Sequence, residues 1–162
     1  MNRNALLALA LVFTVTAAAR FTAAEPALAP TQALSPELRA AFIAEMQHLD
    51  HGLQAAVSAL ARADWPQLEK IAGEIRGSFI LEQKLTPEQL AELHRVLPEP
   101  FLALDRQFHA QAEQLAFAAR ARNGELAAFR AYKLTDGCVS CHSQYARHRF
   151  QAVTPPPDAH RH

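Results

Sequence analysis

Apolar side chains recur at steps of three and four residues through most of the chain, and this period is typical of amphipathic helices. The clearest run follows Ser35-Pro36-Glu37, where serine can cap a helix, proline suits its first turn and an acid suits its positive end. The apolar positions of this run are Leu38, Phe42, Met46, Leu49, Leu53, Val57 and Leu60. Because they form one stripe, we expect the helix to bury that side against other helices.

Further helix starts divide the rest of the chain. Asp64-Trp65-Pro66 begins a second helix, and Thr86-Pro87-Glu88-Gln89 is a capping box that opens a shorter one. The apolar period then predicts a long helix over 101–122 and a last helix from about Glu125 that carries Phe129 and the residues near the end of the chain up to Tyr145. No segment alternates as a strand does. The sequence therefore predicts an all-α fold, an antiparallel four-helix bundle over residues 35–150.

The two ends of the chain differ from this central part. Arg3 precedes an uncharged apolar run from Ala5 to Ala19, and small residues lead to Ala24, which is typical of a secretory signal peptide over residues 1–24. An uncleaved anchor is the alternative. Residues 25–34 predict a linker rich in alanine and proline, and residues 151–162 predict a disordered tail. We therefore expect a periplasmic protein.

Charge composition narrows the classes of partner. The chain has 16 basic and 16 acidic residues, and its formal net charge is zero with neutral histidines. Because there is no basic excess, we expect no binding to nucleic acid. A small neutral protein fits a diffusible carrier or a ligand binder equally well.

The only two cysteines of the chain, Cys138 and Cys141, lie three residues apart, and His142 follows directly. Cys-x-x-Cys-His is the attachment signature of a c-type haem, in which each thiol forms a thioether and the histidine binds the iron. On a helix or turn these side chains share one face and can meet one side of a flat macrocycle. The alternatives are a zinc site that lacks further cysteines, a thioredoxin-type pair without its βαβ context, and a disulfide that closes a very short loop. The sequence therefore predicts one covalent haem c.

The position of this motif resembles the cytochrome c′ and cytochrome c-556 family, which carries it near the end of an otherwise helical chain. The run from Cys141 to Tyr145 also matches the family's Cys-His-x-x-aromatic pattern, and the resemblance covers roughly residues 34–150. The family usually has a basic residue after the aromatic, whereas here Ala146 stands at that place and Arg147 follows it.

The resemblance implies two alternatives for the iron. In cytochromes c′ the sixth position is vacant, is shielded by an apolar residue of the first helix, and binds nitric oxide or carbon monoxide. In cytochromes c-556 a methionine of the first helix fills that position and the protein transfers electrons. Family members are often antiparallel dimers, so the resemblance also implies a homodimer.

Met46 is the residue on which these alternatives turn, because it is the only methionine besides Met1 and lies midway along the stripe of the first helix. A thioether suits haem iron and raises its reduction potential, so Met46 is the candidate distal ligand. The alternative is a methionine that fills the core, with Leu49 as the shielding residue of a five-coordinate site.

The other histidines are expected mainly at exposed or half-exposed positions. His48 and His51 lie opposite Met46 on the first helix and are expected in solvent. His109 has Asp105 and Glu113 four residues away on either side, so the three share a face. We expect a half-exposed polar ridge there; a weak metal site, or a histidine held by carboxylates near the haem, is the alternative.

Two remaining patterns are weaker. Glu45 and His48 match the Glu-x-x-His motif of di-iron bundles, but that fold needs two such motifs and only one is found. Four basic residues flank the haem motif, and they form either a solvated basic face or partners for haem propionates. These residues are Arg130, Lys133, Arg147 and Arg149.

Together these patterns predict a periplasmic monohaem c-type cytochrome that transfers electrons to or from a redox partner, and not an enzyme with its own substrate. The first alternative is a five-coordinate protein on the same fold that binds nitric oxide or carbon monoxide. The second is a haem-free helical binding protein with a thiol switch.

Overall fold

The computed structural model describes residues 29–78 and 85–150, and within these residues the chain forms helices and no strand. The elements are η1 Pro30–Ala33, α1 Pro36–Ala61, α2 Trp65–Arg76, α4 Pro87–Val96, α5 Glu99–Arg120 and α6 Gly124–Tyr145. The predicted all-α fold is thus confirmed, as a helical bundle. The expected signal peptide over 1–24 and the expected tail over 151–162 lie outside the described residues.

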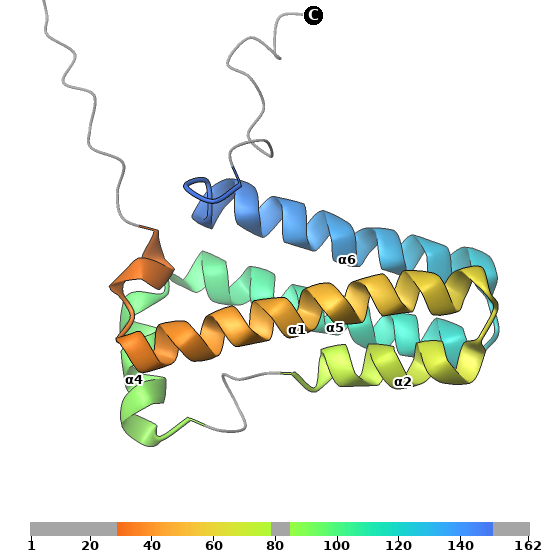
Figure 1. Cartoon of the computed structure of the whole chain (residues 1–162), viewed down its shortest axis with the longest axis horizontal. Helices are drawn as coiled ribbons and strands as arrows, with labels where there is room; N and C mark the ends of the chain where they lie inside the picture. The colour runs from red at the N-terminus through yellow and green to blue at the C-terminus, as the bar shows by residue number, and fades with distance from the viewer. Residues whose placement is uncertain (1–28, 79–84, 151–162) are drawn as a thin grey trace, which may run out of the picture.

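Helices α1, α2, α5 and α6 form the body of the bundle, and α4 lies at one end of it (Figure 1). The turn between α1 and α2 and the turn between α5 and α6 both lie at the opposite end. Helix α5 packs extensively against both α2 and α6, whereas α1 and α6 share much less contact. The seam between α1 and α6 is therefore loosely packed. None of the described helices is long and apolar enough to cross a membrane.

The helix starts largely follow the capping chemistry of the sequence. The Asp64 carboxylate accepts a hydrogen bond from the backbone N–H three residues on, at 3.2 Å, and Thr86 and Gln89 form the reciprocal capping box. Ser35 behaves differently, because its side chain caps nothing. Its backbone N–H instead donates to Glu92 Oε1 at 2.6 Å, which ties the start of α1 to α4.

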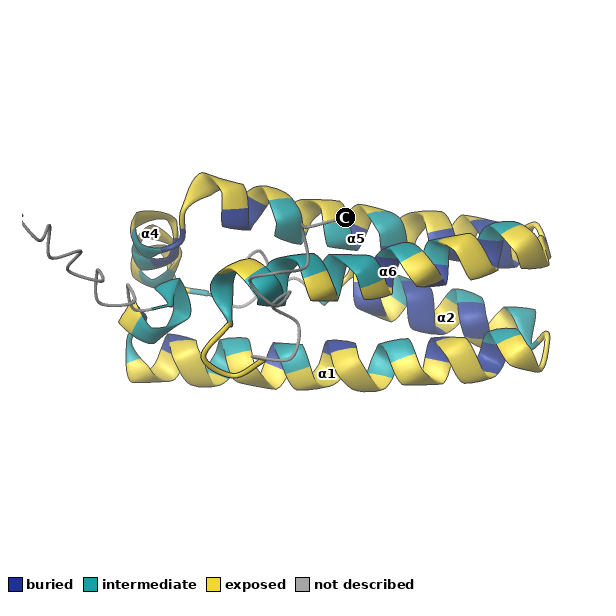
Figure 2. Cartoon of the chain, turned by 90° about the horizontal axis from the view of Figure 1, so that it is seen from above, coloured by how far each residue is buried: buried dark blue, intermediate teal, exposed yellow. Residues whose placement is uncertain are grey.

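Buried apolar side chains form two clusters. The larger cluster lies among the four helices of the body, whose buried positions are dark blue in Figure 2, and it is rich in alanine. Its members are Leu49, Ala56, Ala59, Leu68, Ile71, Ala72, Ile75, Ala112, Leu115, Ala116, Ala118, Ala119, Ala127 and Leu134. The smaller cluster closes the end near α4 and consists of Leu34, Leu38, Leu93, Leu97, Phe101 and Leu102. Leu34 belongs to the segment expected as a linker, yet it is buried there.

Val57 and Phe129 are among the large apolar residues of the helices that are exposed, and Val57 is expected on the inner stripe of the first helix. Val57 of α1 is 50% exposed, because the adjacent Ala56 and a second alanine one turn on take the inner positions. Phe129 of α6 is 51% exposed, because Ala127 and Ala131 on either side of it are the residues that face inward. Small side chains let the helices approach closely, and the larger neighbours then turn outward.

Replacing Leu115 by alanine should lower the free energy of unfolding by about 2–5 kcal/mol, because Leu115 is fully buried between helices and its loss leaves a cavity. The measurement is urea denaturation followed by circular dichroism. Phe117→Ala is the matched control on the same helix, since Phe117 is 55% exposed and should cost under about 1 kcal/mol. Equal losses in the two variants would contradict the described core.

Candidate functional site

A pocket of about 490 Å³ opens between α1 and the C-terminal part of α6. This volume lies in the range of roughly 300–1,000 Å³ that is usual for small-molecule and cofactor sites. Its walls include Phe42 and Met46 of α1, Phe101 of α5, and Cys141, His142 and Tyr145 of α6. The structure thus brings three of the predicted site residues, Met46, Cys141 and His142, onto one pocket.

Aromatic rings make one wall of this pocket. The ring centroids of Phe42 and Phe101 lie 5.8 Å apart, and those of Phe101 and Tyr145 lie 5.1 Å apart in an edge-to-face arrangement. Cys141 and Tyr145 pack against the smaller apolar cluster at this end of the bundle. The pocket therefore offers an apolar surface beside the thiol and the imidazole.

Both cysteines are half-buried thiols that are not joined to each other by a disulfide. Burial raises the pKa of Cys138, and the nearby charge of Asp50 on α1 adds to this effect. Burial likewise raises the pKa of Cys141 to about 11, with smaller contributions from the charge of Asp105 and from Cys138. Each sulfur is therefore protonated at neutral pH in the haem-free chain. Cys138 lies one turn before Cys141 and is not part of the pocket wall.

The imidazole of His142 is half-buried in the pocket wall. Burial lowers its pKa, and the positive charge of Arg149 lowers it further. His142 is accordingly neutral at pH 7, and neutral imidazole is the form that binds a metal ion.

Cationic side chains at the pocket come from two segments of the chain. Arg39 of α1 lines the pocket and donates from Nη2 to the carbonyls of Gln32 at 2.7 Å and Leu34 at 2.9 Å. Arg149, in the turn after α6, lines it as well. No sequence pattern predicts Arg39 as a pocket residue, because only the fold brings the start of α1 beside the end of α6.

The other basic residues that flank the motif are engaged elsewhere. Arg130 donates to Gln111 on α5 at 3.0 Å, and Lys133 pairs with Asp136 at 2.6 Å on its own helix. Arg147 donates to the backbone carbonyl of Ser143. Of the four flanking basic residues, Arg149 is the one that lines the pocket.

The prediction that His109 belongs to a half-exposed polar ridge is wrong, because its side chain is only 2% exposed. Its Nδ1 lies 2.8 Å from the carbonyl oxygen of Ile75 and must donate there, since a carbonyl can only accept. Its Nε2 lies 3.7 Å from Asp105 Oδ1. Glu113, expected on the same ridge, is exposed and pairs with Arg76 across the α2–α5 surface at 3.7 Å.

The partners of His109 explain why a polar side chain occupies the core. Ile75 lies in the last turn of α2, and its carbonyl accepts from His109 Nδ1 as well as from the backbone N–H of Ser78 at 3.3 Å and the Ser78 hydroxyl at 2.8 Å. Burial by itself opposes the charged imidazolium, but the Asp105 carboxylate, the Ile75 carbonyl and the Glu45 carboxylate outweigh it, and the pKa of His109 is raised. Glu45 of α1 is itself only 5% exposed. The cluster of Glu45, His109 and Asp105 thus links α1 to α5.

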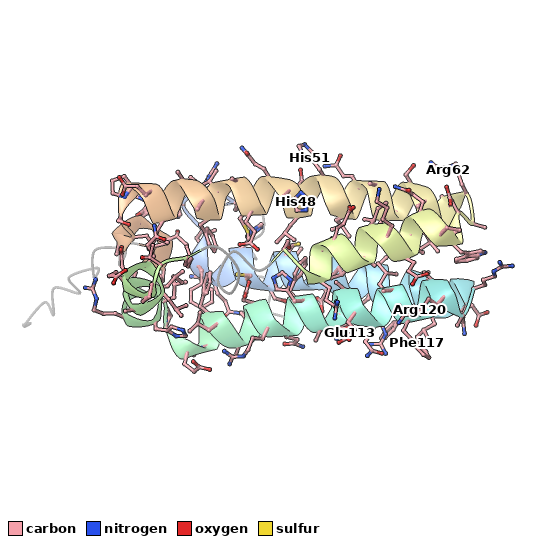
Figure 3. All side chains as sticks on the ribbon, turned by 90° about the horizontal axis from the view of Figure 1, so that it is seen from below. His48, His51, Arg62, Glu113, Phe117 and Arg120 are labelled. Atoms are coloured by element: carbon pink, nitrogen blue, oxygen red, sulfur yellow. The ribbon has the colours of Figure 1, made fainter. Side chains whose placement is uncertain are left out.

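Sequence patterns do not predict the cluster of Glu45, His109 and Asp105 as a whole. In the sequence, Glu45 and His48 match a Glu-x-x-His pattern, but the structure separates the two, since Glu45 is buried and His48 is exposed. His48 and His51 both lie on exposed positions of α1, which confirms the prediction for them (Figure 3). Within residues 29–78 and 85–150, no three histidine, cysteine or acidic side chains are arranged to hold a metal ion by themselves.

Comparison of the chain with protein-family models, with curated proteins and with solved structures gave no significant match.

Alkylation of Cys141 by iodoacetamide should be slow in the folded chain prepared without haem. With its pKa at about 11 instead of 9.0, the reactive thiolate at pH 8 is roughly 100-fold scarcer than for an ordinary thiol. The measurement is the rate of mass increase at pH 8, and the same chain in urea serves as the control. Similar rates in the folded and unfolded chain would contradict the described burial of the thiol.

The stabilising effect of His109 should depend on pH with a definite sign. Because the folded-state pKa of His109 is raised above its ordinary value of 6.5, its charge-dependent contribution is complete below about pH 6.5 and is lost as the pH rises through the raised pKa. The measurement is the free energy of unfolding of the natural chain minus that of His109→Gln, which keeps a donor but does not titrate. This difference should shrink from pH 6 towards alkaline pH; a difference that grows would contradict the cluster.

Proposed function

We propose that this protein is a periplasmic monohaem c-type cytochrome, built on an antiparallel four-helix bundle, that transfers electrons. The observation that carries the proposal is the meeting of Cys141, His142 and Met46 on one pocket of about 490 Å³. Two of these residues belong to the Cys-x-x-Cys-His motif near the end of the chain, and the third comes from a helix almost 100 residues earlier. Sequence spacing alone does not require them to share a cavity.

The donor atoms suit a covalent haem. Cys138 and Cys141 supply two thiols three residues apart on α6, and His142 supplies a neutral imidazole beside them. Bound there, the haem would supply an iron that alternates between its ferric and ferrous states. The protein's part is to hold that iron through its axial ligands and to set the polarity around it.

The pocket has apolar residues that suit the macrocycle of a haem and cationic residues that suit its propionates. The rings of Phe42, Phe101 and Tyr145 present apolar surface, which keeps water from an apolar macrocycle. Arg39 and Arg149 place two guanidinium groups at the same pocket, and guanidinium pairs well with carboxylates such as haem propionates. We expect the partner to be a periplasmic redox protein.

Whether Met46 binds the iron distinguishes electron transfer from the alternative function, binding of nitric oxide or carbon monoxide. Its side chain lines the pocket, which supports a distal thioether ligand and an electron carrier. The same side chain packs against the larger apolar cluster, which supports a methionine that serves the core. In that case the iron is five-coordinate and the protein binds nitric oxide or carbon monoxide.

Intact-mass measurement of the mature protein should show one haem added covalently, and Cys138→Ala with Cys141→Ala should abolish the addition. A chain that carries no haem when it is produced with a c-type maturation system would refute the proposal.

The ferric spin state should separate the two functions. If Met46 binds the iron, the natural protein is low-spin and Met46→Ala becomes high-spin, whereas the control Leu53→Ala, on the same helix and packed against the same cluster, stays low-spin. Electronic absorption and electron paramagnetic resonance report the change. A high-spin natural protein that binds carbon monoxide readily favours the gas binder.

A further inference from the structure

Phe150 lies flat against the imidazole of His142. The two ring centroids are 4.2 Å apart and the ring planes differ by 7°, so the rings are stacked face to face. A face contact leaves both nitrogens of the imidazole at its free edge. Phe150 therefore covers His142 without occupying the position from which a nitrogen binds a metal ion.

The turn that carries Phe150 is tied back to the end of α6. The backbone N–H of Ala146 donates to the His142 carbonyl at 3.0 Å. The N–H groups of Arg149 and Phe150 donate to the Ala146 carbonyl at 2.9 and 3.1 Å. The guanidinium of Arg147 also donates to the carbonyl of Ser143. These bonds fix the turn over the imidazole, and both Phe150 and His142 line the pocket.

A histidine that binds a metal usually has its ring plane fixed by a hydrogen bond from the other ring nitrogen. Among residues 29–78 and 85–150, no group hydrogen-bonds to the ring of His142. The Phe150 ring stacks on it, and the nearby Arg149 acts on it through charge. The bond from an imidazole nitrogen to iron does not itself fix the rotation of the ring about that bond. Some other contact must therefore hold the ring plane.

We infer that Phe150 is a positioning residue that sets the rotational orientation of the His142 ring about its bond to the iron. The inference rests on the proposed haem function. The stack restrains the ring because rotating the imidazole would drive its edge into the Phe150 ring or pull the two faces apart. Phe150 replaces the hydrogen bond that usually performs this task, and it does so from a turn outside the helix that carries the ligand.

The test uses the haem-loaded full chain in its ferric cyanide complex. Cyanide occupies the sixth position whether or not Met46 is the natural ligand, and it is symmetric about its own axis. The spread of the haem-methyl proton shifts then reports the orientation of the His142 ring. The variants are Phe150→Leu and Phe150→Met, which remove the aromatic face by two different side chains, and Phe150→Tyr, which keeps it.

We expect the two non-aromatic variants to retain covalent haem but to lose the natural order and spread of the methyl shifts, while Phe150→Tyr keeps them. Phe129→Leu is the matched control. It also removes an exposed phenylalanine ring, whose centroid lies 6.4 Å from that of Tyr132, but Phe129 does not line the pocket. Unchanged methyl shifts in Phe150→Leu and Phe150→Met, with haem present, would overturn the inference and leave the proposed function standing. A natural chain without haem would instead overturn the proposed function and this inference with it.

Discussion

The packing of α5 against both α2 and α6 is the interaction on which the rest of the structure depends. Alanine dominates these contacts towards the end that carries the two inter-helix turns, with Ala118, Ala119 and Ala127 all fully buried there. Small side chains let the helix axes approach closely. Towards the opposite end α5 contributes Phe101, whose ring lies against Tyr145 of α6 and Phe42 of α1. The pocket between α1 and the end of α6 lies at this aromatic end of the bundle.

Some helix starts follow from local chemistry, because caps act over a few residues, whereas Ser35 does not cap α1 and α5 begins at Glu99, before the expected residue 101. Asp64 and Thr86 cap the helices that they were expected to cap. Which individual side chains point into the core and which point into solvent was less predictable. Val57 and Phe129 carry the right polarity for an inner face, but neighbouring alanines fill that face, and an apolar period cannot reveal which of two adjacent apolar residues packs inward.

His109 and the pocket were harder to predict for a different reason. The burial of His109 depends on a carbonyl at the end of α2 and on Glu45 of α1, and neither is near it in the sequence. Likewise, Cys141 and His142 could be predicted as site residues from their motif. Arg39 belongs to the pocket because α1 lies beside the end of α6, and Phe150 because the turn after α6 folds back over His142. Polar groups that satisfy one another between helices are set by tertiary structure.

The burial of the two thiols has a consequence for the order in which the protein is assembled. In the closed bundle Cys138 and Cys141 are protonated, and Cys141 packs against the cluster at the α4 end. If the protein carries a covalent haem, a closed bundle would be a poor acceptor for it. The motif lies on α6, which follows the other described helices in chain order, and α1 contacts α6 through a loosely packed seam. In that case thioether formation would come before α6 docks, and the haem would itself form part of the surface on which α1 and α6 close.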